Sequence, residues 1–305
     1  MRVSAASVSN SHMHSQQTLF GVALLLLLTR LSAAATLDSN TIISAENSFP
    51  GELVQIVSGA SPPTVVQLIA GGEAEQLLVN DDSVLNMTGG SVTGAIYARH
   101  SSRVSIFGGN LGELDVRFDS VVNLFDGYVG EGVSVSGVQG TPTLNIFGGI
   151  VAGDVAVGGF TSLNMHGGRV GRVSGDVNPG RDYLVNVTGG SFSYFSFRGS
   201  ATVHWSGGES RQNQLFIYDE SVLHIYGSDW KLEYEDHYSG ALLDGTQLTN
   251  FWFDLNGNGR VVLHSVPEPS ALALACAAAL PLALLMIWRS CCAASSQFAP
   301  ASFSR

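Results

Sequence analysis

The chain has very little positive charge. Its 305 residues include 14 Lys and Arg in total, and Lys231 is the only lysine. Charged residues make up 13%, about half of the roughly 25% found in soluble domains. With a formal net charge of -11, the chain offers no basic stripe of the kind that a phosphate backbone requires. These features exclude a nucleic-acid partner.

Cysteine is absent from the body of the chain. The three cysteines are Cys276, Cys291 and Cys292, so no disulfide can form between residues 36 and 270. A secreted domain without disulfides must be held by apolar burial and backbone hydrogen bonds alone. A body of about 230 residues is long enough to bury such a core.

Motifs of enzyme chemistry are also missing from the sequence. There is no serine elbow, no phosphate-binding loop and no dinucleotide fingerprint. We therefore expect no cofactor and no catalytic residues, and the working hypothesis is a protein that is not an enzyme.

A short phrase built on a glycine pair repeats along the middle of the chain, as in SVLNMTGGSV, TLNIFGGIV and SLNMHGGRV. First glycines fall at residues 71, 89, 108, 148, 167, 189 and 207, and Asp126-Gly127 and Gly227-Ser228 complete the series. The steps run from 18 to 22 residues. A near-constant period of this length is typical of repeat architectures.

Each unit alternates buried and exposed positions before its glycine pair. Four residues before the pair stands an aliphatic residue: Leu85, Val104, Val122, Leu144, Leu163, Val185, Val203 or Leu223. Two residues before it stands another apolar residue: Met87, Ile106, Leu124, Ile146, Met165, Val187, Trp205 or Ile225. Such alternation predicts a strand with one buried face, and glycine permits the corner that follows.

The repeat predicts an all-β fold, a single-stranded parallel β-helix (β-solenoid) of about 8 coils with about 20 residues per coil. A sandwich of antiparallel hairpins is the alternative. The regular register argues against the sandwich, because antiparallel neighbours would not bring equivalent residues together.

From the Gly89-Gly90 pair onward, the position three residues before the pair is polar, and asparagine is its commonest residue. The asparagines are Asn86, Asn123, Asn145, Asn164 and Asn186. Amides stacked one rung apart, at about 4.8 Å, can hydrogen-bond to one another as a ladder. We predict such a structural ladder.

The residue just before the pair is expected to face outward. It is Thr88, Phe107, Phe125, Phe147, His166, Thr188, Ser206 or Tyr226. Two interpretations stay open for the three phenylalanines. They can form a stacked ladder that strengthens the sheet, or a platform for a sugar polymer or another protein.

No group of ionisable residues in the repeats predicts a reaction or a metal site. The acids of the body stand mostly at different offsets of the repeat, whereas glycan hydrolysis needs converging carboxylates. His204 and His224 share one repeat position, but zinc needs three or four ligands. Asp254 to Gly259 resembles half of a calcium loop, yet Ser265 stands where the acidic ligand at its twelfth position is required.

The N-terminal segment has the features of an export signal. An apolar run of ten residues, LFGVALLLLL at 19–28, is too short for a normal membrane span of about 20 residues. Small residues at Ala33 and Ala35 suit signal peptidase, so we expect cleavage after Ala35. An uncleaved anchor is the alternative, and either Met1 or Met13 can be the true start.

The C-terminal segment predicts a membrane-spanning helix. Residues 271–288 form an uncharged apolar stretch of 18 residues, which is long enough to span a bilayer. Trp288 and Arg289 follow the pattern of an interfacial aromatic and a cytoplasmic positive stop. Pro267 and Pro269 hold the preceding chain extended, which exposes it just outside the membrane.

This end of the chain resembles the PEP-CTERM sorting tail. The likeness covers residues 266–289 and includes Pro267, Glu268 and Pro269 of the motif, the apolar span and Arg289. The resemblance implies a Gram-negative bacterium and recognition by exosortase, an integral membrane enzyme of transpeptidase type. The chain departs from the pattern in carrying one arginine and a further 16 residues, 290–305.

These features predict a signal peptide at 1–35, an N-terminal cap at 36–70, solenoid repeats at 71–227 and a C-terminal cap at 228–265. The sorting motif and transmembrane helix follow at 266–289, with a short tail at 290–305. The expected function is that of an exported structural or adhesin-like protein of the cell surface or extracellular matrix, with extracellular polysaccharide as a candidate partner. The alternative is a β-helix that binds or degrades polysaccharide.

Overall fold

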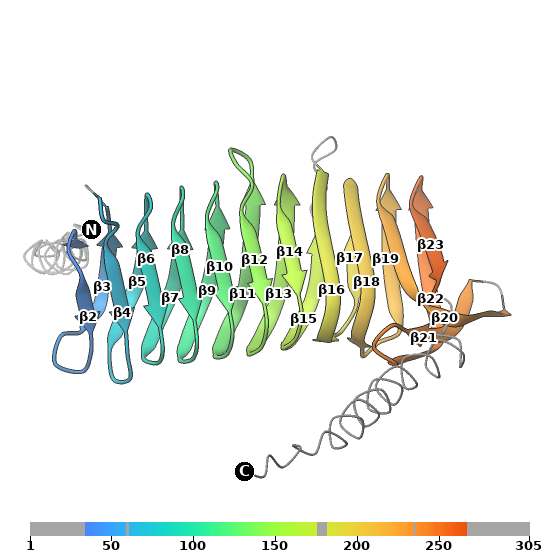
Figure 1. Cartoon of the computed structure of the whole chain (residues 1–305), viewed down its shortest axis with the longest axis horizontal. Coiled ribbons are helices and arrows are strands. Elements are labelled where there is room, and N and C mark those ends of the chain that lie inside the picture. Colours follow the sequence, from blue (N-terminus) through green and yellow to red (C-terminus); the bar gives the residue numbers. More distant parts are fainter. Residues whose placement is uncertain (1–33, 59–60, 176–181, 235, 267–305) are drawn as a thin grey trace, which may run out of the picture.

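The computed structural model describes residues 34–58, 61–175, 182–234 and 236–266. Within them the chain is all β, with 23 strands and no helix, and it coils into a solenoid-like stack of about 10 turns. Figure 1 shows the strands side by side along the long axis, in sequence order from one end to the other. The predicted C-terminal helix lies outside the described residues.

Two series of strands form the two main faces of the stack. The first face contains β2 (Thr41–Ile43), β4 (Val65–Leu68), β6 (Val84–Met87), β8 (Arg103–Ile106), β10 (Val121–Leu124), β12 (Thr143–Ile146), β14 (Ser162–Met165), β16 (Asp182–Phe192), β18 (Ser200–Ser210), β20 (Val222–Tyr234) and β23 (Arg260–Ser265). The second face contains β1 (Ala35–Leu37), β3 (Phe49–Ile56), β5 (Glu73–Val79), β7 (Ser91–Ala98), β9 (Asn110–Arg117), β11 (Tyr128–Gly137), β13 (Ile150–Gly159), β15 (Arg169–Gly175), β17 (Phe195–Phe197), β19 (Gln214–Asp219) and β22 (Gln247–Gly257).

Strands of successive turns pair in parallel, with equivalent residues opposite one another. Leu144 of β12 pairs with Val122 of β10 on one side and with Leu163 of β14 on the other. The prediction of parallel stacking is therefore confirmed, and the antiparallel sandwich is excluded for the repeats.

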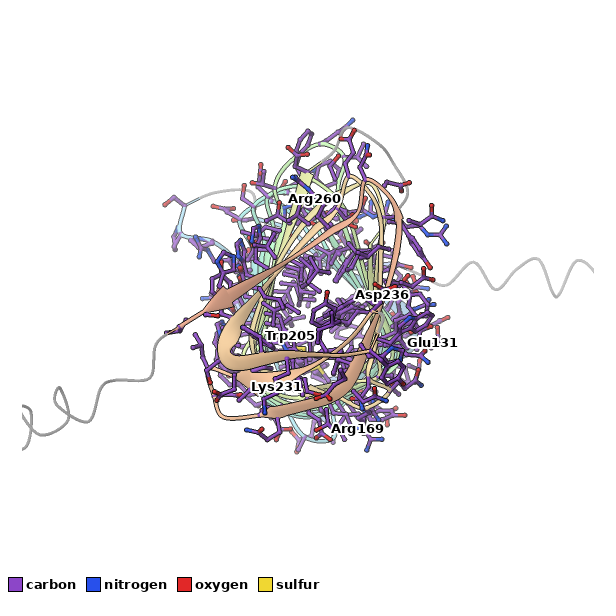
Figure 2. All side chains as sticks on the ribbon, turned by 90° about the vertical axis from the view of Figure 1, so that its right-hand side faces the viewer. Glu131, Arg169, Trp205, Lys231, Asp236 and Arg260 are labelled. Carbon is purple, nitrogen blue, oxygen red and sulfur yellow. The ribbon has the colours of Figure 1, made fainter. Side chains whose placement is uncertain are left out.

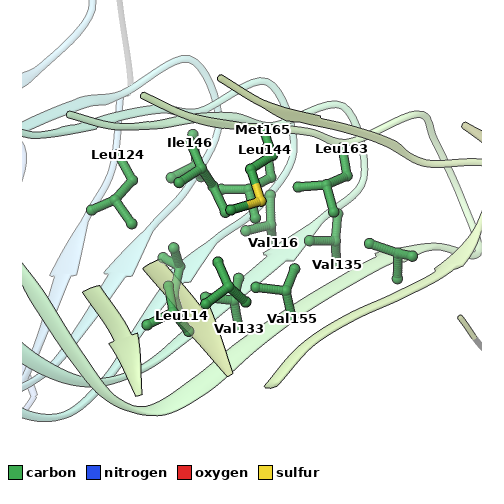
Figure 3. Packing of buried hydrophobic residues seen from close by; sticks show 14 of the residues in the cluster. Leu114, Val116, Leu124, Val133, Val135, Leu144, Ile146, Val155, Leu163 and Met165 are labelled. Atoms are coloured by element: carbon green, nitrogen blue, oxygen red, sulfur yellow. The ribbon is translucent and has the colours of Figure 1, made fainter. Parts of the chain in front are cut away.

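The core is a continuous column between the two faces. Every residue predicted to be buried four and two positions before the glycine pair is at most 1% exposed. Figure 3 shows how Leu124, Ile146 and Met165 of the first face lie opposite Leu114 and Val133 of the second. Because every turn contributes to the same column, the apolar side chains of each turn are buried by those of the neighbouring turns.

The two glycines of a pair serve different purposes at the corner. Gly149 has a φ of +78°, which side chains rarely tolerate. Gly148 instead lies so close to the preceding turn that an added Cβ would stand 2.2 Å from the carbonyl oxygen of Phe125. The second glycine of the pair is therefore required for its positive φ, and the first is required because the turns stack too closely for a side chain.

The stack is longer than the eight or so turns expected, and both segments expected to be caps contribute to it. At the N-terminal end, β2 pairs with β4 and β1 with β3, all in parallel. The repeat is hard to see there because the corner before Gly71-Gly72 has one extra residue: Leu68 pairs with Met87, two residues before its own pair at Gly89-Gly90.

At the C-terminal end, an antiparallel insertion interrupts the last turn. Strand β20 continues beyond Gly227 to pair with β21 (His237–Leu242), which pairs in turn with the first part of β22. The rest of β22 and β23 then return to parallel pairing with β19 and β20. Residues 251–265 therefore form a further turn of the solenoid, and a cap spanning all of 228–265 is not what the structure shows.

The inserted ribbon and the turn that follows it are both attached to the end of the core. Phe251 is buried and packs on Trp205 at a ring-centroid distance of 5.2 Å. Asp244 accepts hydrogen bonds from the backbone N–H of Gly208 and of Thr246, at 2.7 and 2.9 Å. In Figure 2, viewed along the stack, the ribbon carrying Lys231 crosses in front of the coil, whose interior is filled with side chains.

Candidate functional site

A ladder of amides runs along the outside of the first face. Asn145 donates to Asn123, Asn164 donates to Asn145 and Asn186 donates to Asn164, each from Nδ2 to Oδ1 at 2.8 Å. Asn86 lies apart from this chain of bonds. It pairs in register with Gln67 and Ser105, and its side chain has no hydrogen bond among the described residues.

The aromatic residues before the glycine pairs form a second, parallel ladder. Phe107, Phe125, Phe147 and His166 stack face to face, with centroid distances of 4.8, 4.9 and 5.1 Å and interplanar angles of 3°, 9° and 14°. The three phenylalanines remain 39–48% exposed, although each stacked contact covers one face of both rings.

Histidines continue the amide ladder towards the C-terminal end. His204 and His224 stack at 5.0 Å, and His204 Nδ1 lies 2.9 Å from the Tyr226 hydroxyl. His224 Nδ1 lies 2.9 Å from His264 Nε2, so one of these two nitrogens donates to the other. Burial, together with the nearby His204, His264 and Arg260, lowers the pKa of His224 below its ordinary value.

The residues predicted for export and sorting lie at or beyond the limits of the described chain. Ala35 begins β1 and pairs with Val54. Ala33, the motif Pro267, Glu268 and Pro269, and Arg289 lie outside the described residues. In the part of the chain that the structure describes, no helix is long and apolar enough to span a bilayer.

Several acidic residues of the described segments are paired with basic or aromatic neighbours. Asp115 forms an ion pair with Arg117 at 2.8 Å, and Asp154 contacts Arg172. Among the residues that the structure describes, no three His, Cys, Asp or Glu side chains are grouped as metal ligands. Asp254, at the start of the half calcium loop, instead accepts a hydrogen bond from the Tyr218 hydroxyl at 3.1 Å.

A surface on the second face departs from the repetition over the last three turns. Ser196, Phe216 and Asp254 occupy one register position there, and the outward residues on either side of them are equally varied. We call this surface the C-terminal aromatic face. Its members are Tyr194, Ser196 and Arg198 in one turn, Gln214, Phe216 and Tyr218 in the next, and Trp252, Asp254 and Asn256 in the last.

The rings of this face meet edge to face. Phe216 contacts Tyr194 at 5.6 Å and 75°, and Trp252 at 6.0 Å and 82°. Arg172 approaches from the preceding turn, donating to the Tyr194 hydroxyl at 3.2 Å, with its guanidinium carbon 5.8 Å from the centre of that ring. This bond to Tyr194 and the contact with Asp154 raise the pKa of Arg172 despite its partial burial.

An open cavity of about 540 Å³ adjoins the rings and is lined by Arg198, Tyr218, Asp219, Asp254 and Asn256. Its volume falls in the usual range for small-molecule sites, about 300–1,000 Å³. The Arg198 guanidinium lies 5.2 Å from the Tyr218 ring centre. Burial and the hydrogen bond to Asp254 raise the pKa of Tyr218, so its hydroxyl stays protonated at neutral pH.

The C-terminal aromatic face is not predicted from the sequence. The glycine pairs mark the register of the first face, whereas the aromatic residues lie on the second. The signal was present as alternating aromatic residues in YFSFR, QLFIYD and FWFDLN. Their register could not be assigned because the insertion separates the last of these segments from the other two.

The chain matches no known family model, and neither a curated protein nor a solved structure is significantly similar to it. Its function must therefore be argued from its own residues and geometry.

Proposed function

We propose that this chain is an exported, non-enzymatic protein of the cell surface or extracellular matrix, in which a rigid solenoid serves a structural or adhesin-like role. The observation that supports the proposal is the long parallel stack, which resumes after the insertion in its last turn. About 10 turns at ~4.8 Å per rung make a rod of about 50 Å. Its continuous core and side-chain ladders favour a stiff body.

The two ends of the chain supply the proposed route. A signal peptide ending at Ala35 directs export, and cleavage there leaves Thr36 as the first residue of the mature chain. A single transmembrane helix at 271–288, preceded by Pro267-Glu268-Pro269, holds the protein for sorting by an exosortase-type enzyme. The solenoid ends at Ser265, so its last turns lie nearest this anchor and its first turns project away from it.

Intact-mass analysis and proteolysis of whole cells test this proposal together. We expect a mature chain that begins at Thr36 and is digested by proteinase K added outside cells of a host that has an exosortase. A Pro267→Ala/Glu268→Ala/Pro269→Ala variant should keep the N-terminal processing and lose the C-terminal processing. A chain that keeps residues 1–35 and is protected from the protease in intact cells would overturn the proposal.

A chain that reaches the surface but ends beyond Arg289 in both wild type and variant would refute exosortase processing while leaving export intact. The mass measurement therefore separates the role of the sorting tail from that of the signal peptide.

A further inference from the structure

The outward side chains of the second face change character along one register row. In the middle turns this row holds Ser134, Ala156 and Ser174, all small, whereas the turns before them hold Leu78, Tyr97 and Asp115. In the last two turns it holds Phe216 and Asp254, flanked by other large and polar side chains. A purely structural rod needs no such change, because uniform rungs stack best. Binding of a specific ligand does require rungs that differ.

The aromatic rings of the C-terminal aromatic face are arranged differently from those of the phenylalanine ladder. An edge-to-face contact covers a face of only one ring, whereas a stacked contact covers a face of both. Tyr194, Phe216 and Trp252 meet edge to face and are each half-buried, so part of their ring surface stays accessible to a ligand. A ring face carries partial negative charge and attracts polarised C–H groups.

Hydrogen-bonding groups surround these rings within two turns of the coil. Asp254 and Asn256 stand in register with Phe216 and Tyr218, and Gln214 stands in register with Trp252. Carboxylate and amide groups together accept from and donate to hydroxyls. A ligand with apolar C–H faces and many hydroxyls would match both the aromatic rings and the polar groups of this surface. A pyranose ring has both properties.

The local charge favours a neutral sugar. Arg172 is already paired with Asp154, which leaves Arg198 facing the two carboxylates of Asp219 and Asp254. The chain as a whole carries a net charge of -11. Uronic acids and sulfated sugars would be repelled by this excess of negative charge. We propose that the C-terminal aromatic face binds a neutral glycan, with pyranose rings stacked on Trp252 and Phe216 and hydroxyls held by Asp254 and its neighbours.

This inference goes beyond the proposed function, since glycan binding needs neither the signal peptide nor the sorting tail. A membrane surface is the competing occupant, because tryptophan and tyrosine also favour lipid interfaces. The geometry favours the glycan. Insertion into lipid would strip water from Asp219 and Asp254, whereas sugar hydroxyls would replace that water with hydrogen bonds.

The test is calorimetric titration of the full-length chain, purified in a non-glycosidic detergent, with cellohexaose, xylohexaose, mannohexaose and hexagalacturonate. We expect at least one neutral hexasaccharide to bind and hexagalacturonate to bind more weakly. Trp252→Ala should weaken the binding about tenfold or more. Asp254→Asn, which preserves the shape of the side chain, should weaken the binding severalfold. This variant keeps the proposal testable if Trp252→Ala does not fold.

Phe125→Ala is the matched control, because Phe125 is an exposed aromatic residue that belongs to the stacked ladder of the first face. It should leave the affinity unchanged. The proposal is overturned if none of the three neutral sugars binds at up to about 10 mM. Binding that is equal in folded Trp252→Ala, or weakened equally by Phe125→Ala, also overturns it.

A fluorescence measurement separates the glycan from the membrane. Full-length wild type and Trp252→Phe are placed in vesicles of phosphatidylethanolamine and phosphatidylglycerol that contain brominated lipid. The fluorescence of Trp252 is the difference between wild type and Trp252→Phe. If the face binds glycan, we expect the brominated lipid not to quench this fluorescence. Strong quenching would place the face in the membrane and overturn the proposal.

Discussion

The amide ladder gives a sharp prediction, because its members differ in the number of hydrogen bonds they make. Asn145 makes two ladder bonds, one to Asn123 and one from Asn164, whereas Asn186 at the end of the ladder makes one. Asn86 stands at the same repeat position without any ladder bond. Alanine at these positions removes two, one or no bonds while changing the strand in the same way.

The expected cost follows from these counts. A hydrogen bond contributes about 0.5–1.5 kcal/mol net, so Asn145→Ala should lower the free energy of unfolding by about 1–3 kcal/mol. Water can reach these half-buried amides, so the lower half of that range is expected. Asn186→Ala should cost roughly half as much, and Asn86→Ala less than about 0.5 kcal/mol. For a body of this size, each 1 kcal/mol lowers Tm by about 2–4 °C.

The assay is urea unfolding followed by far-UV circular dichroism, with a double-mutant cycle. Asn145→Ala with Asn164→Ala should cost less than the sum of the single changes, by about 0.5–1.5 kcal/mol, because the bond between them is lost only once. The distant pair Asn86→Ala and Asn164→Ala should be additive. If Asn86→Ala costs as much as Asn145→Ala, or the cycle shows no coupling, the ladder bonds do not stabilise the stack.

Three further predictions concern glycines within the strands of the second face and the C-terminal end of the stack. Gly153→Ala would place a Cβ 1.5 Å from the carbonyl oxygen of Glu131, whereas a Cβ at Gly130 would lie 3.5 Å from its nearest atom. Urea unfolding should show that Gly153→Ala lowers the free energy of unfolding by more than about 3 kcal/mol and Gly130→Ala by less than about 1 kcal/mol. Equal decreases would show that close stacking does not require glycine at residue 153. Because the pKa of His224 is lowered in the folded state, the unfolded chain binds more protons below its own pKa of about 6.5, so Tm should fall as the pH drops from 7 to about 5, and His224→Gln should reduce that slope. Burial alone would raise the pKa of Asp244, but backbone hydrogen bonds outweigh it and lower the pKa, so the stabilisation from this carboxylate is present at neutral pH and lost only as the pH falls below about 4. Asp244→Ala should therefore speed limited proteolysis of the inserted ribbon at pH 7, and unchanged cleavage would show that this side chain does not hold the ribbon.

The middle of the fold was predictable because each turn repeats the same short sequence pattern. Leu144 and Ile146 alternate with polar neighbours, and Gly148-Gly149 marks the corner. Such a pattern can be satisfied only when equivalent strands lie side by side. The ends were less predictable. An extra residue before Gly71 and the insertion after Gly227 both break the spacing on which the repeat depends.

The sequence by itself determined the strand alternation, the corners and the parallel, in-register stack, because these depend on neighbours about 20 residues apart. Only the tertiary structure decided which amides bond and where the coil resumes after its insertion. It also brought Trp252 beside Phe216, although 36 residues separate them. The physical reason is that a regular repeat fixes each turn relative to the next, whereas an insertion can be of any length. The register of the strand that follows is set by packing on the core.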